Sequence, residues 1–345
     1  MMNQPRLDFT QYSTFLECPY LWYEKYVKGL ERIRDTGRVN NSRVIGSLVH
    51  KGLERFFKTG DLILEQLDAE ELDAAPEALY TARTLLEGYI QNYSGEELLK
   101  NTIHTEEPLQ FTSTIGYWEV PCVAKVDSYT LLPEATEIRD AQQSHYCEPG
   151  YWIIEHKTKS SELNRAKYAQ AWIANVQADF QIMALESVVR APVQGLIVNV
   201  LEKPRNSAPR RKCRGCGQYS EYSSWLPAED LKHSCPYCGA TQKLSPLGPA
   251  DSYAGDYYRI IVQTNLARRE ALQHSIQNVW GEMQDLRQCT TFAPYVATYN
   301  FRSCVHPIYG PCEFFEPHNT WTGAQEGPLY RIKEDPLQYI EKEQD

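Results

Sequence analysis

The chain of 345 residues has no apolar run that approaches the roughly 20 residues a membrane-spanning helix needs. Its first residues, MMNQPRLDFTQYS, lack the apolar stretch of a secretory signal. There is no internal repeat and no G-x-x-x-x-G-K-[ST] phosphate loop, so a nucleotide-driven motor would have to be a separate chain. These absences predict a soluble, intracellular (cytoplasmic) protein without a membrane partner.

An excess of positive charge is also missing. Lys and Arg number 35 against 45 Asp and Glu, which gives a formal net charge of −10. Phosphate binding normally uses a basic surface, so this balance argues against a nucleic-acid protein. However, a bound metal ion adds local positive charge, and a basic patch can lie on an acidic protein. The hydrophobic content of 42% fits one large domain, or one domain that carries an insertion.

Ten cysteines in such a chain argue for metal ligation, because reducing compartments keep thiols free of disulfides. CRGC and CPYC form two C-x₂-C pairs that are separated by 18 residues, and a glycine follows each pair. Two such turns supply four thiolates to a closed tetrahedral zinc site, here Cys213, Cys216, Cys235 and Cys238. Four thiolates leave no open position for a substrate, so we expect structural Zn²⁺; the alternative is a chance arrangement of reduced thiols.

The four cysteines lie in a segment, 204–250, that is rich in Pro, Ser and Gly and interrupts the succession of helix-like and strand-like segments. We predict an inserted Cys₄ zinc-ribbon module over these residues. Basic side chains next to the first pair could face nucleic acid or a partner, namely Arg210, Arg211, Lys212 and Arg214. A purely stabilising role for the insert is the alternative.

Hydrophobic periodicity outside this segment predicts a mixed order of helices and strands. The expected helices cover 13–28, with Ser13 as a possible N-cap, 46–57, 76–93, 163–189 and 253–286. Strand-like runs fill 103–158 and the segment PVQGLIVNVLEK. The order favours an α/β fold with a central mixed β-sheet flanked by helices, followed by an acidic tail, 336–345, that we expect to fray.

The sharpest chemical pattern is spread over two of these strands. Asp127 interrupts the apolar run VAKVDSYTLL, and Glu155 and Lys157 follow four bulky residues in YWIIEHKT. Positions i and i+2 of a strand point to the same face, so Glu155 and Lys157 should project together, and a neighbouring strand can bring Asp127 beside them. Carboxylates that hold Mg²⁺, which activates a water, and a lysine that stabilises charge on phosphate suit phosphodiester hydrolysis.

This acid-x-Lys pattern is weak when taken alone. Asp230 and Lys232 repeat it without a preceding apolar strand, so we discount that second example. The competing interpretation of Glu155 and Lys157 is a solvated strand end with an ion pair.

Several motifs resemble those of the RecB-like PD-(D/E)XK nucleases, in the family's order and over most of residues 10–190. STFLECPYLWYEKYV is similar to the opening helix, GSLVH to the motif that ends in a metal-binding histidine, VAKVD to the first carboxylate motif and IIEHK to the acid-x-lysine motif. Ala124 stands where the family commonly has glycine. VQADFQ resembles the downstream helix motif: Gln177 fits it, whereas Gln181 replaces a tyrosine.

The resemblance implies a restriction-endonuclease-like core formed by residues 1–203 and 251–335. It further implies that His50, Asp127 and Glu155 ligate Mg²⁺ or Mn²⁺, that Lys157 is catalytic, and that Gln177 contacts the substrate or orients the lysine. The alternatives are a partly buried helix histidine bonded to a carbonyl for His50 and a solvent-facing helix residue for Gln177.

Many RecB-like nucleases hold a [4Fe–4S] cluster with one cysteine from the opening helix and three near the C-terminus. Cys18 matches the first, and Cys304 and Cys312 resemble two of the later ones. The last position holds His318, and Cys289 is a spare cysteine that could substitute. A mixed set could instead bind a second Zn²⁺ or mark a lost cluster, and Cys18 and Cys289 could simply be buried small hydrophobes.

The resemblance implies a metal-dependent DNA nuclease, with exonuclease action on single strands or ends. Its relatives include iron–sulfur exonucleases, CRISPR adaptation nucleases and phage exonucleases, which serve recombination, repair or phage replication. DNA is the expected partner, together with a separate helicase or recombination protein. Two alternatives are a catalytically silent nuclease-fold scaffold, and a protein whose zinc module reads nucleic acid while the rest supports it.

Overall fold

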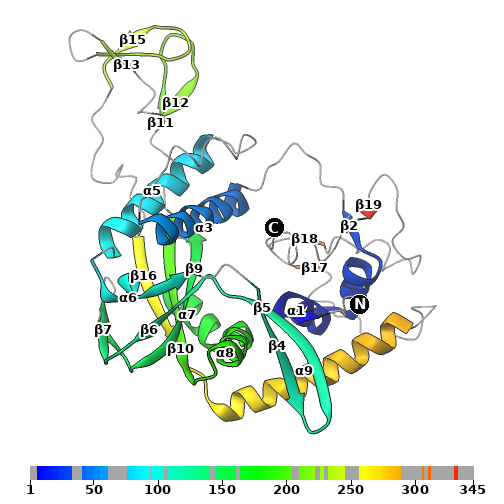
Figure 1. The fold of residues 1–345 in the computed structure, drawn as a ribbon. Coiled ribbons are helices and arrows are strands. Elements are labelled where there is room, and N and C mark those ends of the chain that lie inside the picture. The colour runs from blue at the N-terminus through cyan, green and yellow to red at the C-terminus, as the bar shows by residue number, and fades with distance from the viewer. Residues whose placement is uncertain are drawn as a thin grey trace.

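The structure is a computed structural model that describes residues 6–32, 41–60, 76–93, 95–104, 108–139, 144–160, 164–203, 210–221, 226–228, 232–244, 256–288, 305–306, 310–311 and 330–332 (Figure 1). The helices are α1 (Phe9–Glu17), α2 (Pro19–Trp22), the π-helix η1 (Tyr23–Val27), α3 (Asn41–Thr59), α5 (Pro76–Tyr93), α6 (Glu97–Lys100), α7 (Arg165–Ala174), α8 (Val176–Val189) and α9 (Leu266–Gln288). None of these described helices is long and apolar enough to cross a membrane.

A five-stranded mixed sheet in the order β16-β10-β9-β6-β3 forms the centre of the fold. Its strands are β16 (Asp256–Val262), β10 (Val193–Lys203), β9 (Gly150–Ser160), β6 (Ser128–Leu132) and β3 (Thr102–His104). β9 and β10 pair in parallel, and the other neighbours are antiparallel. The apolar runs of β9 and β10 are buried, as expected for central strands covered on both faces. The predicted central mixed sheet with flanking helices is confirmed.

Side-chain alternation divides this sheet into two faces that carry different polar groups. Ile153 and Val198 pack with Ile182 and Leu185 of α8 on one face, and Glu155 and Lys157 share the parity of Ile153. On the other face, residues of β10 and β16 pack against α3 and α5. His156 belongs to this second face.

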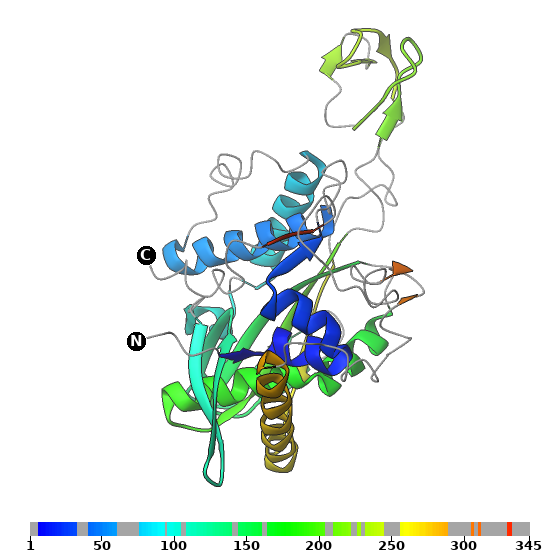
Figure 2. The same cartoon turned by 90° about the vertical axis from the view of Figure 1, so that its right-hand side faces the viewer.

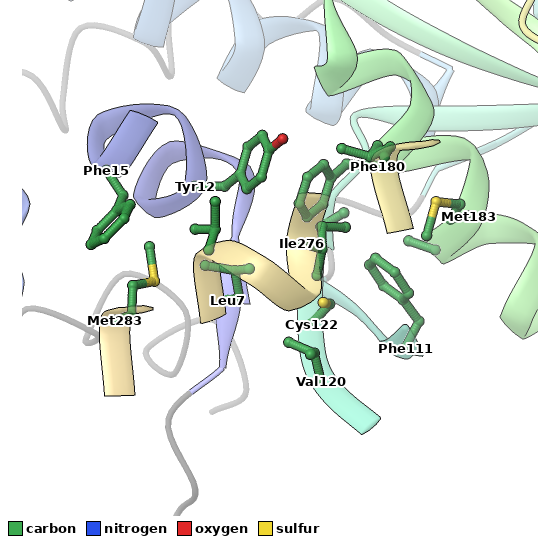
Figure 3. Close-up of a cluster of buried hydrophobic side chains, with 14 of the residues drawn as sticks. Leu7, Tyr12, Phe15, Phe111, Val120, Cys122, Phe180, Met183, Ile276 and Met283 are labelled. Atoms are coloured by element: carbon green, nitrogen blue, oxygen red, sulfur yellow. The ribbon is translucent and has the colours of Figure 1, made fainter. Parts of the chain in front are cut away.

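A smaller sheet supports the first face from the side. It has the order β1-β5-β4, with β1 (Leu7–Asp8), β5 (Trp118–Lys125) and β4 (Pro108–Ile115). Figure 3 shows the hydrophobic cluster that joins it to α1, α8 and α9, with Phe180 of α8 among Tyr12, Phe111 and Ile276. The rings of Tyr12 and Phe180 lie 5.4 Å apart. Because every residue of α8 from Ala178 to Leu185 is buried, this helix is held firmly against both sheets.

The remaining short strands lie outside these two sheets. They are β2 (Leu30–Arg32), β7 (Thr136–Arg139), β8 (Ser144–Cys147), β11 (Arg210–Lys212), β12 (Tyr219–Glu221), β13 (Leu226–Ala228), β14 (Lys232–Ser234), β15 (Thr241–Gln242), β17 (Val305–His306), β18 (Gly310–Pro311) and β19 (Tyr330–Ile332). Strands β11 to β15 make a separate small module that stands away from the central sheet in both views (Figures 1 and 2). The boundaries predicted at 204 and 250, and the tail 336–345, lie outside the described residues.

Four predicted helices differ from the observed ones, and the helix predicted over 46–57 is longer, covering Asn41–Thr59. The opening helix begins earlier, because Asp8 rather than Ser13 is its N-cap and accepts a hydrogen bond from the amide of Gln11 at 2.7 Å. The predicted helix 163–189 is two helices, because the side chain of Asn175 caps a new helix start. The predicted helix 253–286 begins as strand β16, since the β-prone sequence DYYRIIV pairs with β10.

Candidate active site

Asp127 lies where β6 separates from β9. The ladder between these strands ends at Ser128 and Ile154. Beyond it, the backbone amide of His156 donates a hydrogen bond to Asp127 Oδ2 at 2.8 Å. The other carboxylate oxygen, Oδ1, is 3.4 Å from His50 Nδ1 of helix α3. The buried carboxylate is therefore held between a strand amide and the histidine of the GSLVH motif.

Glu155 and Lys157 project together from β9, as the i, i+2 spacing predicts. Lys157 Nζ lies 2.5 Å from Glu155 Oε1. Two glutamines of α8 also approach the Glu155 carboxylate: Gln177 Nε2 donates to Oε1 at 3.3 Å and Gln181 Nε2 to Oε2 at 2.9 Å. Gln181 donates in addition to the carbonyl of Lys125 at 2.9 Å. Gln181, which stands where the family motif has tyrosine, thus makes the shorter of the two hydrogen bonds to Glu155. The sequence motif alone did not identify it as a site residue.

The charges of these buried groups act on one another. Burial raises the pKa of Asp127, but His50 and Lys157 lower it more, so its pKa lies well below the ordinary range. Burial and the Asp127 carboxylate both raise the pKa of Glu155. Burial lowers the pKa of Lys157, yet Glu155 and Asp127 raise it above its ordinary value. Lys157 therefore stays positively charged between two carboxylates that repel each other.

The donor atoms of His50, Asp127 and Glu155 have the chemistry of a divalent-cation site, with one imidazole nitrogen and carboxylate oxygens. His50 and Asp127 are in contact. Burial lowers the pKa of His50, but the Asp127 carboxylate raises it by more, so this pKa lies above its ordinary value. The Glu155 carboxylate instead faces Lys157 and Gln181. In the described part of the chain, the four-cysteine cluster is the one set of three or more His, Cys, Asp or Glu ligand atoms within 4.8 Å.

A pocket of about 140 Å³ lies beside these glutamines. Gln177, Gln181 and Phe180 line it from α8, and its other wall comes from the start of α1 and from β4 and β5, with Asp8, Phe9, Thr10, Pro108, Val123, Ala124 and Lys125. A dry apolar cavity of roughly 150 Å³ can hold one benzene ring. The pocket therefore has room for one planar group beside Gln177 and Gln181.

The four cysteines predicted to bind zinc converge in the small module. Their sulfur atoms all lie within 4.8 Å of one another. Cys213 Sγ is 3.6 Å from Cys238 Sγ, and Cys216 Sγ is 3.8 Å from Cys235 Sγ. Gly217 and Gly239 adopt φ of 74° and 71° after the two pairs, a conformation that favours glycine. The predicted four-cysteine cluster is confirmed.

The tight turns also direct backbone amides at two of the sulfur atoms, which favours the thiolate form that binds a cation. The amide of Gly215 donates to Cys213 Sγ at 3.3 Å and that of Tyr237 to Cys235 Sγ at 3.4 Å. Backbone hydrogen bonds, first that of Cys216, lower the pKa of Cys213 to about 6. A thiolate held by amides is a good zinc ligand.

The predicted iron–sulfur set is only partly visible. Cys18 is buried at the N-cap of α2, where its Sγ accepts a hydrogen bond from the amide of Leu21 at 3.4 Å. Burial raises the pKa of its thiol. Its proposed partners Cys304, Cys312, His318 and Cys289 lie outside the described residues.

Residues 6–115 match the family model of the PD-(D/E)XK nuclease superfamily. The matched segment includes His50 but ends before Asp127. No curated protein matches the chain. A solved structure titled "Crystal structure of SSO0001" is 9% identical over 86% of this chain and 96% of its own, with a TM-score of 0.23, which is too low to bear on the fold.

Proposed function

We propose that this protein is a Mg²⁺- or Mn²⁺-dependent deoxyribonuclease that hydrolyses phosphodiester bonds at the site of Asp127, Glu155 and Lys157. The observation that carries the proposal is that Asp127, just before β6, interacts with Glu155 and Lys157 of β9, while His50 of the superfamily-matched segment contacts Asp127. The match of residues 6–115 to that superfamily supports a metal-dependent phosphodiesterase with a nucleic-acid substrate.

Each residue of the site would have a distinct role. His50, Asp127 and Glu155 would hold the divalent ion. When bound, such an ion polarises the phosphoryl oxygen and lowers the pKa of a water ligand. Lys157, which stays positively charged, would stabilise the charge that develops on the phosphate.

Gln181 would orient Glu155, and a substitution can test this. Gln181→Leu removes the donors to both Glu155 and the Lys125 carbonyl, and loss of such a supporting contact typically costs about 10- to 100-fold in metal affinity or activity. Gln177→Leu, on the same helix, removes the longer contact alone, so it should cost less. Mn²⁺ titration calorimetry and single-turnover cleavage would measure both. A larger loss for Gln177→Leu would contradict this order.

We further propose that this nuclease is an exonuclease of the RecB-like branch, which acts on single strands or DNA ends in recombination, repair or phage replication. It rests on the ordered motifs from the opening helix to VQADFQ. The pocket beside Gln177 and Gln181 is compatible with a terminal base, since it has room for one planar group. We also propose a cytoplasmic location, a helicase or recombination protein as a separate partner, and a metal at Cys18 with the C-terminal cysteines.

The zinc-ribbon module would add a contact to DNA. Residues 210–244 contain six Lys and Arg against three Asp and Glu, in a chain whose net charge is −10. Arg214 lies exposed in one cysteine turn, and Tyr237, with 66% of its surface exposed, lies in the other. Cations and an exposed ring suit phosphate contacts and base stacking.

The decisive experiment is cleavage of end-labelled single- and double-stranded DNA by the wild-type protein in Mg²⁺, Mn²⁺ or EDTA. Degradation with either ion and none in EDTA is the expected result. The order of appearance of products separates removal of terminal nucleotides from internal cutting. A folded, metal-loaded protein that cuts neither substrate would instead favour a catalytically silent nuclease-fold scaffold.

A further inference from the structure

A chain of buried polar side chains crosses the face of the central sheet that is opposite Glu155 and Lys157. His156 of β9, Asn199 of β10 and Arg259 of β16 are direct neighbours in the sheet register. Tyr89 of α5 lies above them, and Glu96, just after α5, closes the far end. His156, Asn199, Arg259 and Tyr89 are each at most 3% exposed. Buried polar groups of this kind must satisfy one another, so their proton positions are constrained.

The direction of these side-chain hydrogen bonds is set at the charged end of the network, where Glu96 and Arg259 lie. Arg259 Nη1 lies 2.6 Å from Glu96 Oε2, and its Nε donates to Asn199 Oδ1 at 2.8 Å. A guanidinium can only donate, so the carbonyl oxygen of Asn199 must face Arg259. The amide nitrogen of Asn199 therefore faces the other way, where it donates to the Tyr89 hydroxyl at 3.0 Å.

The Tyr89 hydroxyl then has one direction left for its own proton. It accepts from Asn199, and Arg259 is a further side-chain hydrogen-bond partner. Burial raises the pKa of Tyr89, so the hydroxyl keeps its proton. The remaining neighbour is His156 Nε2 at 3.2 Å. Asn199 Nδ2, a pure donor, also lies 3.4 Å from His156 Nε2. With two donors in front of it, Nε2 is an acceptor without a hydrogen.

A neutral imidazole whose Nε2 accepts must carry its hydrogen on Nδ1. Nδ1 of His156 faces Asp127 Oδ2 at 3.8 Å, and the backbone amide of the same residue donates to that oxygen at 2.8 Å. Both N–H groups of His156 are thus directed at one oxygen of Asp127. The other oxygen remains turned towards His50.

We propose that Glu96, Arg259, Asn199, Tyr89 and His156 form a positioning network that fixes His156 as the Nδ1–H tautomer and so orients the Asp127 carboxylate. His156 and the residues behind it are positioning residues, because none touches the substrate. The inference rests on the proposed function where it assigns Asp127 as a metal ligand. The assignment of the tautomer is independent of that function.

Asn199→Asp tests the network because it reverses the direction of its hydrogen bonds with almost no change of shape. A carboxylate only accepts, so one oxygen still accepts from Arg259 while the other accepts the Tyr89 proton. The hydroxyl then accepts from His156, whose hydrogen moves to Nε2. Asn265→Asp is the matched control, since it adds the same charge at the exposed N-cap of α9, where aspartate serves equally well.

The first readout is the long-range ¹⁵N–¹H spectrum of the imidazole rings in the metal-free protein, with His156 assigned by its loss in His156→Gln. The wild type and Asn265→Asp should show hydrogen on Nδ1, and Asn199→Asp hydrogen on Nε2. Hydrogen on Nε2 of wild-type His156 would overturn the proposal, and this measurement does not depend on the folding of any variant.

The second readout is Mn²⁺ affinity by calorimetry. Asn199→Asp should bind Mn²⁺ about 10-fold more weakly, the size expected when an outer contact to a ligand is lost, and Asn265→Asp should match the wild type. An Asn199→Asp protein that changes tautomer but binds Mn²⁺ like the wild type would overturn the role in orienting Asp127. A wild type with the expected tautomer that neither binds Mn²⁺ nor cuts DNA would contradict the proposed function and, with it, the positioning of a metal ligand.

Discussion

Replacing Lys157 by methionine should lower the rate of DNA cleavage about 100- to 1,000-fold, the loss typical of removing one preorganised group that stabilises charge in a transition state. The ammonium group lies 2.5 Å from Glu155, and both carboxylates raise its pKa, so it is a fixed positive charge at the site. Methionine retains most of the aliphatic stem but has no charge. Single-turnover cleavage of labelled DNA at saturating Mn²⁺ measures the chemical step directly.

Lys159→Met is the matched control for this experiment. Lys159 lies two residues further along the same face of β9, is buried where Lys157 is partly exposed, and lies 3.5 Å from Glu202. Its removal leaves Glu202 paired with Arg165 at 2.8 Å, so no carboxylate is left buried and alone. Cleavage by Lys159→Met should stay near the wild-type rate. If the two variants lose activity equally, or if Lys157→Met cuts like the wild type, Lys157 has no special part in the chemistry.

Local patterns were sufficient to predict that Glu155 and Lys157 lie side by side and that the four cysteines cluster. The bulky residues before Glu155 marked a buried strand, and the two-residue period placed Glu155 and Lys157 on one face. The histidine of GSLVH lies against Asp127 across 77 positions of sequence, which the resemblance implied and no periodicity could reveal. The four cysteines were predictable because their spacing alone determines how two tight turns meet.

The residues that support Asp127 and Glu155 from behind were not predictable, because their positions depend on pairing between distant segments. His156 is the middle residue of the acid-x-lysine motif, and its buried polar neighbours appear only when β10 and β16 bring Asn199 and Arg259 beside it. Likewise, Gln181 looked like a departure from a tyrosine motif until the break at Asn175 set the phase of α8. The sequence favoured one long helix over 163–189, because a capping asparagine inside an apolar pattern is a weak signal.

Replacing two of the four clustered cysteines should unfold the small module of residues 210–244 while the rest of the chain stays folded. The buried hydrophobic cluster found in the described part of the module consists of Cys213 and Cys235 with Ala240 and Leu244 packed against them. Such a core buries too little apolar surface to fold unaided, whereas structural zinc in small modules supplies roughly 10–16 kcal/mol of apparent binding free energy. A metal ion held by the four cysteines would therefore provide most of the folding free energy of this module.

Cys216→Ser with Cys238→Ser is the sharpest form of this test, because both thiols are exposed and the buried pair remains in place. Zinc content should fall from one equivalent to none, and the amide signals of 210–244 should collapse while those of the central sheet persist. Arg214→Ser, within the first cysteine turn, is the control that keeps every ligand and should retain zinc. DNA affinity should fall in both variants if the module contacts DNA, because one loses the whole surface and the other an exposed cation. A metal-free module with its native spectrum would show that the cysteines are incidental to its fold.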